Sequence, residues 1–260
     1  MMFRTFAAAA VLVSCSAAAQ AATAVVTDVS GFPSATQWGT LPGENTQGGT
    51  AAVTGAAPRS GNGSLEMTGG RTRTQLGIQY AGALTDLGDL ASVQSLTFDW
   101  MIANGSSNPY NVDYTPALRL LIQNGANRQE LIWEGAYNNV YGPQTEQGIW
   151  YSSSANDLFY ITGGSVNEGR TIADWASLLT GARVSGISVG VGSGASTGYH
   201  AFADNVTLAT RGGSTTYNFE LAGAVPEPST WAMLILGFGV IGGALRRRRT
   251  TVRGGIAFAA

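Results

Sequence analysis

Short apolar runs separated by clusters of Gly, Asn and Ser make up most of the sequence between residues 22 and 221. In the clearest run, Leu96, Phe98 and Trp100 alternate with other residues, which places the three side chains on one face of a β-strand. Runs of the same kind recur at Leu131–Trp133, Ile149–Tyr151, Leu158–Ile161, Val184–Val191 and Ala201–Leu208. Many short strands joined by tight turns predict an all-β body, an antiparallel β-sandwich or jelly roll.

Three other segments of the body have different patterns. Ala117–Ile122 is apolar almost throughout, which favours a strand that is covered on both faces. Thr171–Leu179 carries apolar residues at helical spacing and predicts the one short helix of the body. Thr36–Ser64 is loop-like, and we expect a flexible insertion there.

The first 21 residues have the layout of a secretory signal peptide. Arg4 precedes an alanine-rich apolar run that is too short to span a bilayer, and Ala19 and Ala21 are the small residues that a signal peptidase reads. We therefore expect cleavage after Ala21 and export across the inner membrane of a Gram-negative-type bacterium. The alternative is a lipoprotein signal that ends at Cys15, with the cysteine acylated. Cleavage after Ala21 leaves a mature chain without cysteine, whose stability depends on a packed core.

The charge of the exported body, residues 22–222, excludes nucleic acid as a partner. All 14 basic residues of the chain are arginine, and six of them lie in the terminal segments. Residues 22–228 keep eight arginines against 16 acidic residues, a formal net charge of −8. Such a field repels phosphate backbones, and the body has no basic patch interleaved with aromatic residues.

Residues 223–260 have the layout of a membrane anchor. A Pro-Glu-Pro sequence precedes residues 230–245, an apolar stretch that we expect to form a short transmembrane helix. Trp231 lies at its outer end, where an amphipathic ring suits the headgroup layer. The inner end carries four arginines, Arg246, Arg247, Arg248 and Arg249. Guanidinium groups favour the cytoplasmic side, so we expect the body outside and the arginines inside.

This order of features resembles the PEP-CTERM sorting signal in its PEPxxWA variant, with Pro226, Glu227 and Pro228 followed at the matching spacing by Trp231. The resemblance implies recognition by an exosortase, a membrane cysteine transpeptidase-like enzyme that cuts near the Pro-Glu-Pro sequence. It also implies transient anchoring in the inner membrane, followed by release to the cell surface or the extracellular matrix. Residues 250–260 depart from the pattern by extending past the arginines. The alternative is a plain single-span anchor with a proline-rich neck.

Two short segments of the body resemble carbohydrate-binding jelly rolls. Gly63–Met67 is similar to an early strand of such modules, and Ala203–Leu208 is similar to their closing strand. The resemblance implies a structural calcium ion, the one candidate cofactor, held between an acid of the closing strand and an acid near the N-terminus. Asp204 and Asp28 are the candidate ligands. The alternative is that Asp204 and Asn205 bond to a neighbouring turn.

Aromatic side chains of the body favour glycan binding, because sugars stack on flat aromatic faces. The candidates are Trp38, Tyr110, Tyr137 and Tyr141. Trp133 and Trp150 fit a core position equally well.

Catalysis has weaker support in the sequence. Glu130 and Glu134 share a strand face, but about 13 Å separates their backbones, and a solvated sheet face explains them as well. His200 is the only histidine, and its position at a strand start predicts an exposed turn residue. We therefore expect a non-enzymatic protein of the cell surface or extracellular matrix that binds extracellular polysaccharide. The alternative is a secreted glycan-active hydrolase that uses these carboxylates.

Overall fold

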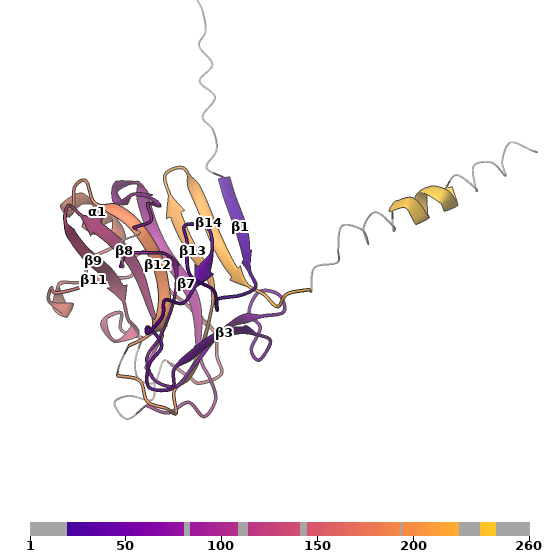
Figure 1. The fold of residues 1–260 in the computed structure, drawn as a ribbon, viewed down its shortest axis with the longest axis horizontal. Helices are drawn as coiled ribbons and strands as arrows, with labels where there is room; N and C mark the ends of the chain where they lie inside the picture. Colours follow the sequence, from indigo (N-terminus) through magenta and orange to yellow (C-terminus); the bar gives the residue numbers. More distant parts are fainter. Residues whose placement is uncertain are drawn as a thin grey trace, which may run out of the picture. The chain divides into compact units, whose positions relative to one another are not determined.

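The structure is a computed structural model that describes residues 20–80, 84–108, 114–140, 145–192, 194–223 and 235–242 (Figure 1). The chain divides into two units, Met1–Glu220 and Leu221–Ala260, and each is described by itself. The first unit contains the body, which is mostly β, as the sequence predicts. The described part of this unit forms two sheets of seven strands each. In the second unit, residues 235–242 form a helix.

Sheet A is built around the long strand β13 (His200–Thr210). One edge of β13 pairs with β7 (Val93–Ile102), and β7 in turn pairs with the short strand β10 (Tyr151–Ser152). The other edge of β13 forks. Its first half pairs with β4 (Ser64–Thr68), and its second half pairs with β14 (Gly213–Phe219).

Each branch of the fork carries one further strand. β3 (Thr50–Thr54) pairs with β4, and β1 (Gln20–Val26) pairs with β14 (Figure 1). The β1–β14 pair is parallel, whereas the sequence predicted an antiparallel arrangement throughout. The first strand of the body therefore lies beside the last one, a long-range pairing that no local pattern encodes.

Sheet B has the strand order β11-β9-β8-β12-β5-β2, and β6 also pairs with β12. Its strands are β2 (Trp38–Gly39), β5 (Thr72–Gly77), β6 (Gly88–Asp89), β8 (Ala117–Asn124), β9 (Asn127–Trp133), β11 (Tyr160–Ile161) and β12 (Arg183–Val191). Three short 3-10 helices complete the described body, namely η1 (Leu90–Ser92), η2 (Gly135–Tyr137) and η3 (Val166–Glu168).

The body's α-helix, α1 (Ile172–Leu178), lies where helical spacing predicted it. Thr171 caps its start, because the Thr171 hydroxyl accepts a hydrogen bond from the Asp174 backbone N–H at 3.2 Å. Trp175 is buried, and its indole N–H donates to the Phe159 carbonyl at 2.7 Å. The apolar face of the helix is thus held against the body.

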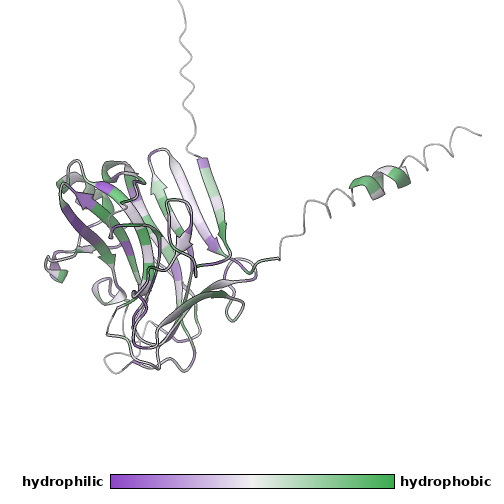
Figure 2. Cartoon of the chain, in the orientation of Figure 1, coloured by the Kyte–Doolittle hydropathy of each residue, from purple (hydrophilic) through white to green (hydrophobic). Residues whose placement is uncertain are grey.

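One apolar core is shared by the two sheets. Phe98 of β7 packs edge-on against Trp133 of β9, with 5.1 Å between the ring centroids. Leu96, Phe98 and Trp100, which the sequence placed on one face, are each 1% exposed. Figure 2 shows green hydrophobic residues alternating with paler or purple ones along the strands. All buried residues of this core lie between Val26 and Phe219, so a chain that ends at residue 223 keeps the whole core.

The segment Thr36–Ser64, predicted to be a flexible insertion, instead contributes two strands to the body. It contains β2 of sheet B and β3 of sheet A. Trp38, predicted to bind glycan, is only 2% exposed, and its ring lies 5.2 Å from that of Phe219. The prediction for Trp38 was wrong because its polar and glycine-rich neighbours in the sequence hide a position that tertiary packing buries.

Candidate functional site

Most of the sorting segment lies outside the described residues. This holds for Pro226, Glu227, Pro228, Trp231, Arg246, Arg247, Arg248 and Arg249, and also for Cys15 and Ala19 near the N-terminus. Within the expected span 230–245, residues 235–242 are helical, and their large apolar side chains are exposed. No helix in the described part of the chain has the length and apolarity that a bilayer crossing requires. The expected span is therefore not confirmed.

The expected signal cleavage site overlaps the start of the fold. Ala21 is the second residue of β1 and pairs with Ser214 of β14. Cleavage after Ala21 would remove Gln20 and Ala21 and leave five residues of the strand. The cleavage itself stays a prediction.

The outward face of sheet B carries the largest group of buried charges in the described body. Leu118, Leu131 and Leu76 point into the core from β8, β9 and β5. Because side chains alternate along a strand, Arg119, Glu130 and Arg73 lie on the opposite face. We call this surface the charged face and define it by Arg73, Tyr80, Arg119, Glu130, Glu134, Tyr137 and Tyr160.

Arg73 and Glu130 form a bidentate ion pair at the centre of the charged face. The Nη1 and Nη2 atoms of Arg73 each donate to one carboxylate oxygen of Glu130, at 2.9 Å in both cases. The two residues come from β5 and β9, which are separated in the sheet by β12 and β8. Three strand spacings are about 14 Å, so both side chains must extend along the sheet surface toward each other.

Small residues of β12 leave room for this pair. Ile187 and Val189 of β12 belong to the core, so Gly186, Ser188 and Gly190 lie under the charged face. The two side chains of the pair keep exposed fractions of only 10% for Arg73 and 7% for Glu130. Glu130, predicted to stand on a solvated sheet face, is therefore a buried partner of an arginine.

Arg119 is the second cation beside Glu130. Its Nε atom lies 3.6 Å from Glu130 Oε2, and burial, ahead of repulsion from Arg73, lowers the pKa of its guanidinium. In the described structure, the buried Nη1 atom of Arg119 and the buried hydroxyl of Ser188 each lack a hydrogen-bond partner. Ser188 stands directly opposite Arg119 in the β8–β12 register, so the two unsatisfied groups are neighbours.

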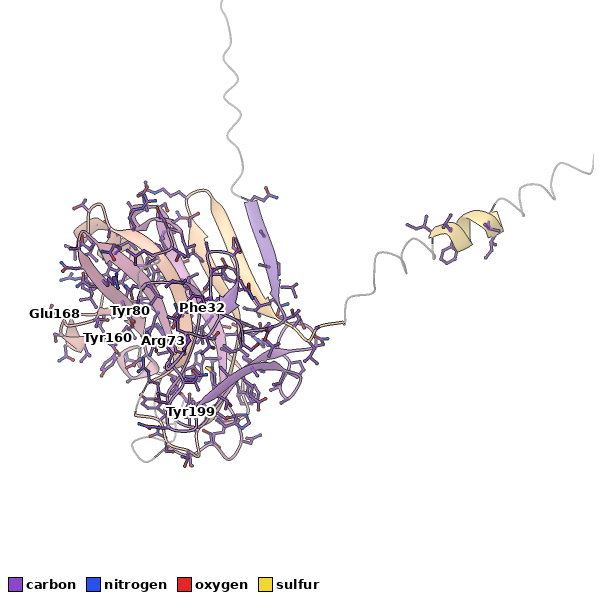
Figure 3. The ribbon with its side chains drawn as sticks, in the orientation of Figure 1. Phe32, Arg73, Tyr80, Tyr160, Glu168 and Tyr199 are labelled. Carbon is purple, nitrogen blue, oxygen red and sulfur yellow. The ribbon has the colours of Figure 1, made fainter. Side chains whose placement is uncertain are left out.

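Tyrosines flank the arginine–glutamate cluster. Tyr80 is 38% exposed and its hydroxyl lies 3.4 Å from Glu130, while Tyr137 is 39% exposed (Arg73, Tyr80 and Tyr160 are labelled in Figure 3). Tyr137 packs edge-on against Tyr160, with 5.4 Å between the centroids. Aromatic and charged side chains thus share one sheet face, an arrangement that can stack a planar group and bind polar groups beside it.

Glu134 lies next to these tyrosines, just after β9. Burial raises the pKa of the Glu134 carboxyl, and this rise is opposed by the charge of Arg119 and by a hydrogen bond from Tyr160. Burial together with the nearby Glu134 charge raises the pKa of the Tyr160 hydroxyl. Tyr160 therefore stays a hydrogen-bond donor at neutral pH.

Of the four aromatic residues predicted to bind glycan, the structure places only Tyr137 on the charged face. Trp38 is in the core, and Tyr110 and Tyr141 lie outside the described residues. Arg73, Arg119, Tyr80 and Tyr160 were not predicted. The signal for Arg119 was present in the sequence, because a charge within an apolar run needs a buried partner.

The fork of sheet A contains Asp204, one of the two predicted calcium ligands. Its Oδ1 atom accepts hydrogen bonds from the backbone N–H groups of Asn205 at 2.8 Å and Phe219 at 2.9 Å, and Oδ2 accepts a longer one from Ser60 at 3.3 Å. The Asp204 carboxylate therefore bonds to β14, to its own strand β13 and to the loop between β3 and β4. This is the turn-bonding alternative that the sequence left open.

Asp28, the other predicted calcium ligand, bonds locally. Its two carboxylate oxygens accept from the backbone N–H and the hydroxyl of Ser30, each at 2.9 Å, which lowers the pKa of Asp28. Among the described residues, no group of three or more His, Cys, Asp or Glu side chains could hold a metal ion. Calcium binding stays an untested prediction.

We expect Asp204 to make the body more stable in mild acid. Burial raises the pKa of Asp204 from 3.8 to about 6, against the opposing effect of its three backbone donors. Because the folded state binds the proton more tightly, this stabilisation is full below pH 3.8 and is lost as the pH rises through about 6. The loss is at most about 3 kcal/mol. Urea unfolding of fragment 22–223 at pH values from 3.8 to about 6 measures this loss of stability. Asp204→Asn should make the free energy of unfolding depend less on pH. An equal slope in both proteins would contradict the assignment.

His200 is not an exposed turn residue as predicted. It is the first residue of β13, and its Nε2 atom lies 2.7 Å from Glu66 Oε1 on the neighbouring strand β4. The side chain is 34% exposed. His200 therefore belongs to a cross-strand pair on sheet A and lies outside the charged face.

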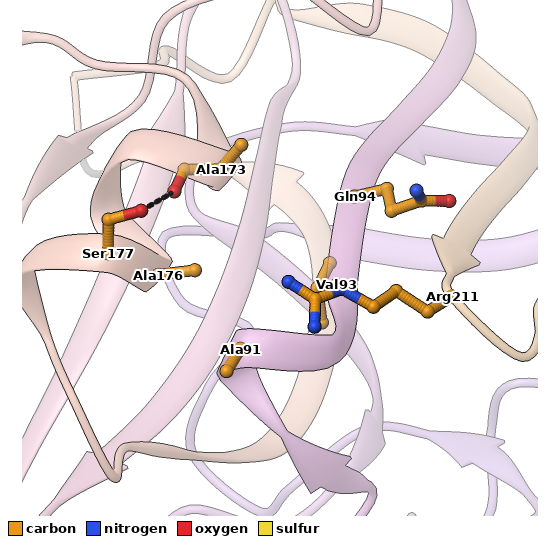
Figure 4. Close-up of a pocket in the computed structure, with 7 residues that line it drawn as sticks. All are labelled: Ala91, Val93, Gln94, Ala173, Ala176, Ser177 and Arg211. Carbon is orange, nitrogen blue, oxygen red and sulfur yellow. Dashed lines mark hydrogen bonds between the residues drawn. The ribbon is translucent and has the colours of Figure 1, made fainter.

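A separate surface pocket of about 500 Å³ lies beside α1 (Figure 4). It is lined by Ala91, Val93, Gln94, Ala173, Ala176, Ser177 and Arg211. The Ser177 hydroxyl donates to the Ala173 carbonyl of its own helix at 3.0 Å. Arg211 is the only charged residue of this lining, and no aromatic residue takes part, so the pocket offers less chemistry than the charged face.

An all-β body followed by a Pro-Glu-Pro sequence, an apolar stretch and an arginine block defines an exported protein that is sorted through its C-terminus. The family model of the PEP-CTERM protein-sorting motif matches residues 224–249. The chain therefore carries a PEP-CTERM signal, which directs its processing by the membrane enzyme exosortase and its export to the cell surface. No curated protein matches the chain.

Proposed function

We propose that this protein is a non-enzymatic component of the cell surface or extracellular matrix, and that its body binds extracellular polysaccharide through the charged face. Before sorting, the apolar stretch holds it transiently in the inner membrane. The body would then be a β-sandwich of the carbohydrate-binding kind. One observation carries the proposal: two partly exposed tyrosines, Tyr80 and Tyr137, flank a cluster of arginine and glutamate on a single sheet face.

The chemistry of the charged face suits saccharides. Flat rings cover the apolar side of a sugar, and neighbouring charged groups bond to its hydroxyl or carboxylate groups. Tyr137 and Tyr80 supply partly exposed rings, and Tyr160 supplies a hydroxyl that stays protonated. The arginine–glutamate pair is at most 10% exposed and its groups bond to each other, so the tyrosines supply the contacts to the sugar.

A glycan-active hydrolase is the second candidate, because the raised pKa of Glu134 suits a general acid. Glycoside hydrolysis needs a second carboxylate as nucleophile or base. Glu130 is the nearest candidate in sequence, but both of its oxygens accept hydrogen bonds from Arg73, and Arg119 lies beside it. A carboxylate held in this way is a poor nucleophile, so the observation favours binding.

Affinity electrophoresis tests the proposal. The mobility of fragment 22–223 should fall in gels that contain extracellular polysaccharide from the producing cell. Tyr137→Ala should weaken retardation by about three- to tenfold, the worth of one aromatic contact. Leu178→Ala, which removes an exposed apolar side chain from α1, is the control and should leave retardation unchanged.

The same samples separate binding from hydrolysis. We expect no new reducing ends after incubation with the polysaccharide. Reducing ends that appear with the native fragment and vanish in Glu134→Gln or Glu130→Gln would favour the hydrolase. Absence of retardation with the cell's own polysaccharide, and also with neutral dextran and anionic alginate, would overturn the binding proposal.

A further inference from the structure

β1 is an edge strand whose outer side is unpaired in the described structure. It pairs with β14 over all seven residues, from Gln20 opposite Gly213 to Val26 opposite Phe219. No strand among the described residues pairs with its other edge. The backbone N–H and C=O groups along that edge are therefore available to a further strand.

β1 lacks the features that usually protect such an edge. Proteins limit edge pairing with very short strands, charged side chains or proline. Among the other outermost strands, β2, β10 and β11 have two residues each and β3 has five, so β1 with seven residues is the longest of them. By contrast, β1 reads QAATAVV, without a charge or a proline, and beyond its first residue it is green to white in Figure 2.

Both faces of β1 are weakly covered as well. Val25 is 53% exposed on one face. On the other face, Ala22 lines an open groove of about 550 Å³ together with Leu208 and Tyr217. An added strand would cover Val25 and extend the floor of this groove, which removes apolar surface from water.

We propose that β1 pairs antiparallel with β1 of a second copy of this chain, so that sheet A continues across a two-fold axis. The body carries a net charge of −8 between residues 22 and 228, so two copies repel each other over most of their surface. β1 contributes nothing to this repulsion, because it has no charged side chain. A two-fold contact also buries both copies of Val25 at once. The inference is independent of polysaccharide binding.

Signal cleavage sets the length of the contact. Removal of the residues up to Ala21 leaves Ala22–Val26 as the first strand of the mature chain. Antiparallel pairing of all five residues places Ala24 opposite its own copy. Such an interface is smaller than that of stable complexes, so we expect a weak, concentration-dependent dimer.

A charge on the edge strand tests the proposal. Fragment 22–223 should show a monomer–dimer equilibrium in sedimentation velocity over a concentration series. Val25→Lys should weaken dimerisation at least about tenfold, because the two lysines would lie on the same sheet face, diagonally across the axis, and would repel each other. Leu178→Lys places the same charge on a side chain that is 56% exposed in α1 and should leave the equilibrium unchanged. Circular dichroism and the thermal midpoint verify that both variants fold.

Disulfide trapping locates the contact, because the mature chain has no cysteine of its own. Opposed residues of antiparallel strands have Cα separations that a disulfide can span. Ala24→Cys should therefore form a covalent dimer under mild oxidation, whereas Ser177→Cys on α1 should not. A fragment that stays monomeric over the whole series would overturn the proposal. The proposal would also be overturned if Val25→Lys left the association unchanged. The same holds if the Ala24→Cys variant formed crosslinks no faster than the Ser177→Cys variant.

Discussion

Replacing Glu130 by alanine lowers the free energy of unfolding by about 3–5 kcal/mol, because the change leaves a buried cation without its partner. Arg73 donates two hydrogen bonds of 2.9 Å to this carboxylate, and Arg119 lies 3.6 Å from it. Neither guanidinium can turn to bulk water, since both residues are less than 10% exposed. For a domain of this size, the thermal midpoint should fall by about 6–20 °C.

Urea unfolding of fragment 22–223 measures this loss. Arg183→Ala is the matched control, because Arg183 also pairs with two carboxylates, Asp86 and Asp89, but at the surface. Solvent screens such pairs, and we expect the unfolding midpoint of this variant to stay unchanged. A loss below about 1 kcal/mol for Glu130→Ala would mean that the ion pair is not buried in solution.

We expect the mature protein to end near Pro226 to Thr230 in a cell that contains exosortase. The PEP-CTERM motif at residues 224–249 directs the processing, and the prolines on either side of Glu227 disfavour helix, which keeps the backbone accessible. Replacing Pro226, Glu227 and Pro228 by alanine should abolish cleavage almost completely. The intact mass of the surface-exposed protein measures the outcome.

Deletion of residues 250–260 is the control for sorting, because the matched motif ends at residue 249. This shortened chain should be processed as the full chain is. Recovery of a native species that retains Arg246–Arg249 from a processing-competent cell would contradict the prediction. Activity of a reporter fused after Ala260 only in the periplasm would also contradict it, because the orientation would then be reversed.

Sequence patterns predicted those parts of the fold that short-range periodicity encodes. The alternation of Leu96, Phe98 and Trp100 identified a core-facing strand, and Thr171–Leu179 identified the helix. The charged face was only partly foreseen, through Tyr137, Glu130 and Glu134. Arg73 could not be assigned, because its partner is 57 residues away and three strands across the sheet.

The sequence by itself determined the all-β class of the body and the presence of a sorting signal, since both depend on residue types at short, regular spacing. Only the tertiary structure decided that Trp38 is buried and that Arg73 and Glu130 form an ion pair. The same is true of the hydrogen bond from Phe219 to Asp204 and of the parallel pairing of β1 with β14. Apart from the Asp204–Phe219 bond within the β13–β14 hairpin, these contacts join segments that are distant along the chain. Their pairing depends on how the whole chain buries its apolar surface, and local periodicity carries no information about it.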